Sequence, residues 1–287
     1  MSARVNPIGA NTWIWVSPLT DERLAALAPK IKAWGFDLIE LPIEDPTDWD
    51  PARTAELLDR LPLRASIACV MAPGRGFTGD DRATVEETRT YLRACINVAA
   101  NIGAGVVAGP MYAPTGTCRR LERGERAIVV DRIVAGLRPV VAYAEERGVA
   151  LGIEPINRFE TSVVNTAEQA LEIVERIDSP ACGVLLDTFH MNIEEKLPAA
   201  AIRAVGSRLV HFHACGTDRG TPGKDHTAWE EIFAALIGID YRGALVIESF
   251  TAENQTIATA ASIWRPLAPT QDEIATDGLA FLRQMMM

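Results

Sequence analysis

The chain has 287 residues and a formal net charge of −10, with 48% hydrophobic and 23% charged residues. This composition is ordinary for a globular protein with a full hydrophobic core, and the length suits one large domain over residues 1–287. A nucleic-acid-binding surface would require clustered Lys and Arg, so the acidic balance argues against a nucleic-acid partner.

The cysteines and the N-terminal segment bear on where the protein works. Five cysteines are scattered along the chain without a CxxC pair, a pattern of reduced cytosolic proteins that fits neither a disulfide framework nor a zinc ribbon. The N-terminus has no hydrophobic region of a signal peptide. No uninterrupted apolar stretch reaches the ~18 residues that a membrane span needs. We therefore expect a cytoplasmic protein without a membrane partner.

Short apolar runs alternate with amphipathic segments along the whole chain. The apolar runs predict strands at residues 8–15, 36–41, 64–70, 105–109, 148–153, 183–186, 209–212 and 244–247. The amphipathic segments predict helices at residues 21–34, 52–61, 83–102, 127–147, 166–177, 197–205, 227–237 and 270–285. Because no linker or low-complexity segment interrupts this alternation, we expect an α/β fold, a single (β/α)8 TIM barrel.

Two local signals mark helix ends. Gly35 is placed to end the helix at 21–34 with a left-handed residue. Thr166 is followed three residues later by Gln169, and this capping box predicts the start of the helix at 166–177.

Four consecutive strands, the fifth to the eighth, finish on groups that can bind a divalent cation. These groups are Glu154, Asp187, His213 and Glu248. The ends of parallel strands meet on one face of a barrel, so the four side chains should converge. Without a cation, confining them there would cost several kcal/mol of repulsion and desolvation. Three carboxylates and one His favour Mn²⁺, Co²⁺ or Mg²⁺ over a structural zinc.

The other histidines of this region have two interpretations each. His211 shares the parity of His213 and should lie one layer deeper in the barrel, where it either supports His213 or simply fills the core. His190 lies three residues past Asp187 at the barrel mouth. It either contacts a substrate or is an exposed loop residue.

Two charged residues and two tryptophans are further candidates. Glu160 and Arg219 lie on loops beyond strand ends, where they are either solvated surface charges or anchors for sugar hydroxyls. Trp15 and Trp264 also lie near strand ends, and they are either core residues or surfaces on which a sugar stacks.

The motifs of the second half resemble those of a known enzyme family. They are IEPINRFET (153–161), LDTFHMN (186–192), HFH (211–213), DRG (218–220) and SIWRPL (262–267). The chain resembles the D-tagatose/D-psicose 3-epimerases, a ketose 3-epimerase branch of the xylose-isomerase-like sugar isomerases. The resemblance is dense from residue 148 to 267 and only general before that.

The resemblance implies roles for the candidate residues. It implies Glu154, Asp187, His213 and Glu248 as ligands of one divalent cation per subunit, with Mn²⁺ as the expected ion. Glu154 and Glu248 would also be the two acid/base groups.

The resemblance also implies what the enzyme handles. Glu160, His190 and Arg219 would contact the substrate near C1 to C3. Two long loops, at residues 71–82 and 110–124, should cover the far end of the sugar, and they carry no motif that identifies it.

We therefore expect a metal-dependent epimerisation of free ketoses at C3, of the D-tagatose, D-psicose, D-fructose or L-ribulose type. The C3 proton beside a C2 ketone is weakly acidic, and a cation bridging O2 and O3 stabilises the enediolate. Inversion then requires a base on one face and an acid on the other. No organic cofactor is expected, and we expect the protein to form a homodimer or homotetramer.

Three alternative functions follow from the same sequence. A hydroxypyruvate or aldose–ketose isomerase on this scaffold could keep the same ligands. An endonuclease IV-like barrel would need more histidines for a multi-metal centre than the four present. A third alternative is a sugar-binding barrel without catalysis, and the presence of both Glu154 and Glu248 argues against it.

Overall fold

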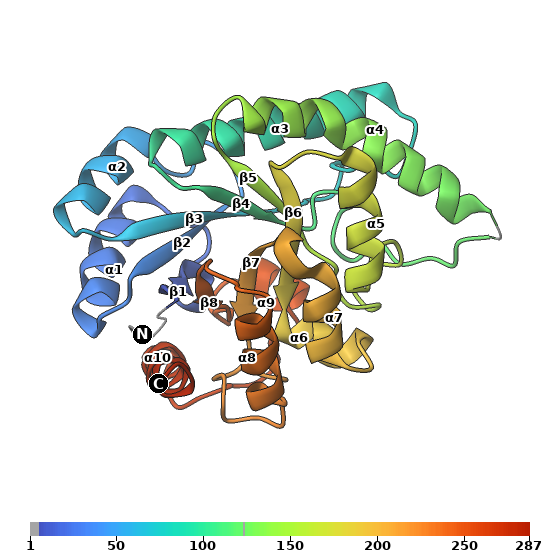
Figure 1. Cartoon of the computed structure of the whole chain (residues 1–287). Helices are drawn as coiled ribbons and strands as arrows, with labels where there is room; N and C mark the ends of the chain where they lie inside the picture. Colours follow the sequence, from blue (N-terminus) through green and yellow to red (C-terminus); the bar gives the residue numbers. More distant parts are fainter. Residues whose placement is uncertain (1–5, 123) are drawn as a thin grey trace.

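The apolar runs form eight parallel strands, each paired with the next in sequence, and β1 pairs with β8 so that the sheet closes (Figure 1). This computed structural model describes residues 6–122 and 124–287; residues 1–5 of the expected domain and position 123 of the loop at 110–124 lie outside that description. The strands are β1 Ile8–Asn11, β2 Leu38–Ile43, β3 Arg64–Cys69, β4 Val106–Gly109, β5 Ala150–Ile153, β6 Cys182–Asp187, β7 Leu209–Ala214 and β8 Leu245–Ile247. The predicted single (β/α)8 barrel is therefore confirmed.

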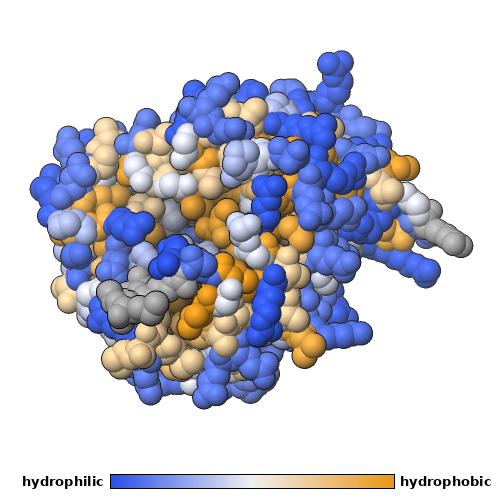
Figure 2. Space-filling model, in the orientation of Figure 1, coloured by the Kyte–Doolittle hydropathy of each residue, from blue (hydrophilic) through white to orange (hydrophobic). Residues whose placement is uncertain are grey.

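The helices surround the strands in Figure 1. They are α1 Asp21–Trp34, α2 Pro51–Arg60, α3 Arg82–Asn101, α4 Glu125–Glu145, α5 Ala167–Ile177, α6 Thr188–Glu194, α7 Pro198–Val205, α8 Trp229–Gly238, α9 Gln255–Ala260 and α10 Gln271–Met285. Two 3₁₀ turns, η1 Thr12–Ile14 and η2 Gly206–Arg208, complete the described elements. Among the described residues, no helix is long and apolar enough to cross a membrane. Hydrophilic side chains cover most of the rim of the face drawn in Figure 2.

The two local signals for helix ends are confirmed. Gly35 follows α1 in the left-handed conformation with φ of 97°, and its N–H bonds back to the carbonyls of the last turn. Thr166 accepts a hydrogen bond from the backbone N–H of Gln169, and the Gln169 side chain accepts one from the backbone of Thr166. These caps satisfy backbone groups that a helix end would otherwise leave unpaired.

The first strand is shorter than predicted. It ends at Asn11, whose side-chain oxygen accepts a hydrogen bond from the Trp13 N–H at 2.9 Å and so caps a 3₁₀ turn. The strand predicted at residues 8–15 is therefore wrong beyond Asn11, and Trp13 and Trp15 lie outside it. Trp13 packs beside Phe250, with ring centroids 5.3 Å apart, whereas Trp15 stacks on Trp34.

Two short helices were not predicted, and both lie at the barrel mouth. α6 begins directly after β6, because the Asp187 carboxylate accepts a hydrogen bond from the Phe189 N–H at 2.8 Å and caps the helix. α9 follows β8 and is capped by Asn254. Both helices are shorter than two full turns, so their sequence carries little periodicity.

One glycine permits a close approach of two strands beside the site. Gly109 ends β4 with φ of 145°, and a Cβ atom there would lie 2.7 Å from the carbonyl oxygen of Cys69 at the end of β3. Any larger residue would push these strand ends apart. The contact therefore shapes the wall of the cavity described next.

Candidate active site

A cavity of about 430 Å³ opens at the carboxyl ends of the strands. One part of its wall is polar and is formed by Glu154, Glu160, His190, His213, Arg219 and Glu248. The rest is mainly apolar and includes Trp13, Ala68, Val70, Met71, Ala108, Pro110, Phe250 and Ile257. Both long loops contribute, since Met71 and Thr115 lie in this lining. The barrel therefore places its cavity on the face that the strand order predicts.

The structure brings the four predicted ligand residues together. Glu154 follows β5, Asp187 ends β6, His213 lies near the end of β7 and Glu248 follows β8. One donor atom from each of Glu154, Asp187 and His213 lies within 4.8 Å of the others. The fourth residue joins them, because Glu248 Oε1 is 3.3 Å from His213 Nδ1. All four side chains are buried.

These residues fit a hard divalent cation. Carboxylate oxygens and one imidazole nitrogen suit Mn²⁺ or Mg²⁺ better than the thiolate-rich sets of structural zinc. Within the described part of the chain, neither buried ring nitrogen of His213 has a hydrogen bond of good geometry. A buried polar atom without a partner is costly, and a cation at Nδ1 would remove that cost.

The pKa values of the two glutamates of the site are shifted in opposite directions. Burial, reinforced by the charge of Glu248, raises the pKa of Glu154 well above its usual value. Burial acts on Glu248 too, but the charges of His213 and Arg219 lower the pKa of Glu248. Two carboxyl groups whose pKa values are pushed apart can serve as an acid and a base in one site.

The pKa values of the other two candidate ligands, Asp187 and His213, are also shifted. Burial raises the pKa of Asp187 to about 6, although the charge of Arg219 opposes the shift. Burial opposes the charged form of His213, yet the carboxylates of Glu40 and Glu248 raise the pKa of His213 well above its usual value. The imidazole thus lies between two carboxylates.

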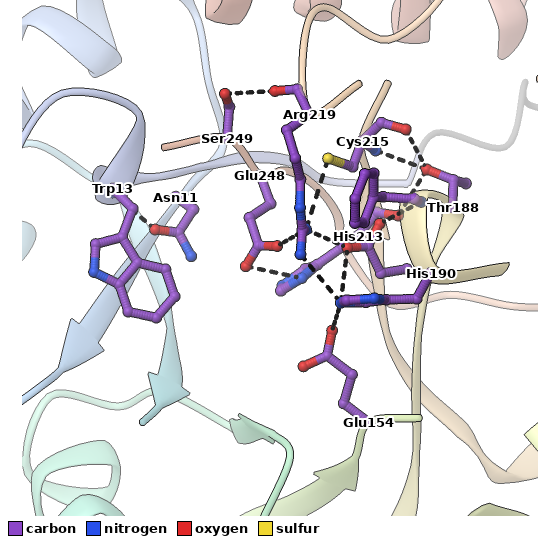
Figure 3. Close-up of polar contacts among 12 residues, drawn as sticks. Asn11, Trp13, Glu154, Thr188, His190, His213, Cys215, Arg219, Glu248 and Ser249 are labelled. Carbon is purple, nitrogen blue, oxygen red and sulfur yellow. Dashed lines mark hydrogen bonds and ion pairs between the residues drawn. The ribbon is translucent and has the colours of Figure 1, made fainter. Parts of the chain in front are cut away.

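Arg219 is a buried residue of the site, so its interpretation as a solvated surface charge is wrong. Its Nη1 donates to Asp187 Oδ2 at 2.9 Å and to Glu248 Oε2 at 2.8 Å. Its Nη2 lies 3.2 Å from His190 Nε2 and 3.6 Å from Glu160 Oε1. The guanidinium therefore links four polar groups of the site, as Figure 3 shows for Glu248 and His190.

The backbone and two aromatic rings fix the direction of the Arg219 side chain. Arg219 has φ of 68°, and its carbonyl oxygen accepts a hydrogen bond from Ser249 Oγ at 2.6 Å. The guanidinium carbon lies 3.9 Å from the ring centroid of Phe189 and 5.0 Å from that of Phe250. Stacking and cation–π attraction hold a planar guanidinium better than an ammonium.

His190 is buried on α6, which excludes the exposed-loop interpretation. Its Nδ1 accepts a hydrogen bond from the Asn157 N–H at 3.0 Å, and its Nε2 lies 3.7 Å from Glu154 Oε1. Burial and the charge of Arg219 lower the pKa of His190 well below its usual value. Glu160 is less buried and accepts a hydrogen bond from Asn157 Nδ2 at 2.7 Å. Both His190 and Glu160 line the cavity.

Sequence reasoning missed two residues at the site. Trp13 lines the cavity, whereas Trp15 and Trp264, the two tryptophans considered as sugar-stacking surfaces, do not line it. Glu40 is fully buried and contacts both His211 and His213. The signal for Glu40 was present, because it is the one charged residue inside the apolar run at 38–43.

Comparison with known proteins gives the class of this barrel. The model of the xylose isomerase-like TIM barrel family matches residues 28–285. A probable ketose 3-epimerase of Synechocystis sp. is 33% identical over 276 residues, which cover 96% of this chain and 95% of the relative.

Two solved structures are similar over nearly the whole chain. A structure of L-ribulose 3-epimerase superimposes with a TM-score of 0.92 at 30% identity, covering 98% of this chain and 95% of the other. A D-allulose 3-epimerase from Methylomonas sp., in complex with D-allulose, gives a TM-score of 0.89 at 30% identity and covers 99% of each chain. The chain belongs to the ketose 3-epimerases of the xylose isomerase-like TIM barrel family.

Proposed function

We propose that this protein epimerises free ketoses at C3 with the help of a divalent cation. The observation that carries the proposal is the pair Glu154 and Glu248, which reach one cavity from β5 and β8 with His213 between them. The relatives support the ketose class, since they are named L-ribulose 3-epimerase and D-allulose 3-epimerase. A substrate of the D-tagatose, D-psicose, D-fructose or L-ribulose type follows from this class.

The chemistry requires a proton to leave C3 on one face and to arrive on the other. Glu154, Asp187, His213 and Glu248 would hold a divalent cation, which supplies the Lewis acidity that makes the C3 proton removable. One glutamate takes that proton as a general base, and the other delivers a proton to the opposite face. Their roles exchange in the reverse reaction. The opposite pKa tendencies of the two side chains support this division of work.

The remaining wall residues would hold the sugar in place. Arg219, His190 and Glu160 offer a charged donor, a ring nitrogen and a carboxylate to the hydroxyl groups near C1 to C3. Among the described residues that line the cavity, Arg219 is the only Lys or Arg. A single cationic side chain supports an unphosphorylated substrate, since phosphate recognition relies on Lys and Arg donors.

The finer assignments also belong to this proposal. Mn²⁺ is the cation we expect, with Co²⁺ or Mg²⁺ as substitutes, because one nitrogen accompanies three carboxylates. We expect no organic cofactor, one catalytic domain over residues 1–287, and a homodimer or homotetramer. All five cysteines are free, which is compatible with work in the reducing cytoplasm.

The test is a panel of free ketoses with added Mn²⁺, followed by chromatography of the C3 epimers. In deuterated water, the product should carry deuterium at C3. Turnover of hydroxypyruvate or of an aldose, without C3 inversion of any ketose, would favour the alternative isomerase. Tight binding of a ketose without exchange of its C3 hydrogen would instead identify a sugar-binding protein.

A further inference from the structure

A second polar cluster lies inside the barrel and centres on Glu40. Its Oε1 accepts hydrogen bonds from Ser66 Oγ at 2.9 Å and is 2.6 Å from His211 Nε2. Its Oε2 accepts one from Asn11 Nδ2 at 2.9 Å and is 2.8 Å from His213 Nε2. A fully buried carboxylate is tolerated only when its lone pairs are satisfied, and here four side chains surround it.

The cluster connects opposite sides of the barrel. Asn11, Glu40 and Ser66 come from the neighbouring strands β1, β2 and β3, whereas His211 and His213 come from β7. Glu40 does not belong to the cavity lining. It therefore cannot touch a substrate in that cavity, and any effect on the chemistry must pass through a residue that does.

That residue is His213, whose two ring nitrogens face different carboxylates. Nδ1 lies on the side of the candidate metal centre, 3.3 Å from Glu248 Oε1, and Nε2 lies 2.8 Å from Glu40 Oε2. Among the described residues, both contacts are close but lack the alignment of a hydrogen bond. A neutral imidazole has one N–H and one lone pair, and a metal ligand must present the lone pair to the cation. The partner of the other nitrogen decides which arrangement is present.

We propose that Glu40 is a positioning residue: when the cation binds, its nearby carboxylate accepts the Nε2–H of His213 and so presents the Nδ1 lone pair to the cation. This inference rests on the metal site of the proposed function and adds a residue to it. Asn11, Ser66 and His211 keep the Glu40 carboxylate in place, since Ser66 and His211 occupy one oxygen and leave the other for His213 and Asn11.

A second cation between Glu40, His211 and His213 is the competing explanation, because their ligand atoms also lie within 4.8 Å of one another. Ligands at ~2.1 Å from one cation lie ~3 Å apart. The separation of 2.6 Å between His211 Nε2 and Glu40 Oε1 is instead that of a short hydrogen bond. Ser66 and Asn11 further occupy the Glu40 oxygens that a cation would need.

The test measures the affinity of the substrate-free protein for Mn²⁺ by titration. The concentration of free Mn²⁺ is read from its electron paramagnetic resonance signal. Glu40→Gln keeps the size of the side chain, but its amide can donate as well as accept and no longer requires an N–H on His213. We expect Mn²⁺ binding to weaken about 10- to 100-fold. The matched control is Asp37→Asn, the same carboxyl-to-amide change just before β2, where Asp37 Oδ2 accepts a hydrogen bond from the Ile8 N–H at 3.1 Å. This variant should leave the affinity within about twofold of wild type, because it does not alter a partner of His213.

An independent measurement uses the unchanged sequence, so it does not depend on the folding of a variant. In the Co²⁺-loaded protein, the ring N–H of His213 should give a strongly shifted proton signal that is present in H₂O, exchanges slowly and is absent in D₂O. Loss of that signal in Glu40→Gln would support the inference.

Two results would overturn it. They are a folded Glu40→Gln protein that binds Mn²⁺ as tightly as wild type, and the absence of the N–H signal from Co²⁺-loaded wild type. A wild type that binds Mn²⁺ but epimerises no ketose would refute the proposed function alone. A wild type that binds no Mn²⁺ would overturn both.

Discussion

Replacing Arg219 tests whether the polar wall of the cavity holds the substrate. Its guanidinium is buried and aligned by Phe189 and Phe250, so Arg219→Ala removes a charged donor that water cannot replace in the same position. A hydrogen bond to a charged group contributes about 1.5–3 kcal/mol. If one such bond to the substrate is lost, kcat/KM should fall roughly 10- to 150-fold. Arg219→Lys should recover only part of this loss, because an ammonium lacks the planar fork.

The assay is ketose turnover together with the metal content of the same samples. Arg265→Ala is the matched control, since Arg265 follows β8 but is exposed and forms a surface ion pair with Asp218. Such a surface pair contributes about 0–1 kcal/mol, so the control should keep near-normal kcat/KM. Normal kinetics of a fully metallated Arg219→Ala protein would refute the assignment of Arg219 to substrate binding.

Three further predictions concern the acid/base pair and the metal. Glu154→Gln and Glu248→Gln should each lose C3 inversion. The variant that keeps the base for a given epimer can still exchange the C3 hydrogen of that epimer with deuterated water. Near-normal inversion by either variant with bound metal would contradict the two-base assignment. Removal of the cation with a chelator should abolish activity and lower the melting temperature, because a cation at 100 times its Kd stabilises the folded state by about 2.7 kcal/mol; full activity of a metal-free sample would disprove the metal requirement. Burial raises the pKa of Asp187 to about 6, and a metal ligand must be deprotonated. Mn²⁺ affinity should therefore fall by about tenfold per pH unit as the pH drops below that value. Titrations that give the same affinity at pH 5 and pH 7 would contradict this.

The sequence predicted the barrel and the meeting of Glu154, Asp187, His213 and Glu248, because the geometry of parallel strands alone determines where strand ends lie. It could not predict that Arg219 and His190 are buried, since both depend on loops and on α6, which folds over the mouth after Asp187 caps it. These contacts come from separate segments and leave no periodic signal.

Two other residues were missed for different reasons. Trp13 was placed on a strand because an apolar run continues past Asn11, and only the side-chain cap of Asn11 ends that strand. Glu40 was passed over because its partners lie on β1, β3 and β7, far away in the sequence. A buried charge inside an apolar strand was the available warning.

The candidate ligands all come from β5 to β8, whereas much of the apolar wall comes from β3, β4 and the loops that follow them. If the proposed function holds, catalysis and recognition of the far end of the sugar would therefore occupy different halves of one barrel. Insertions or substitutions within residues 71–124 can reshape the space for the distal carbons without moving a single proton-transfer group. We therefore expect that changes confined to the first half of the chain would alter which ketose is accepted and leave the proposed reaction unchanged.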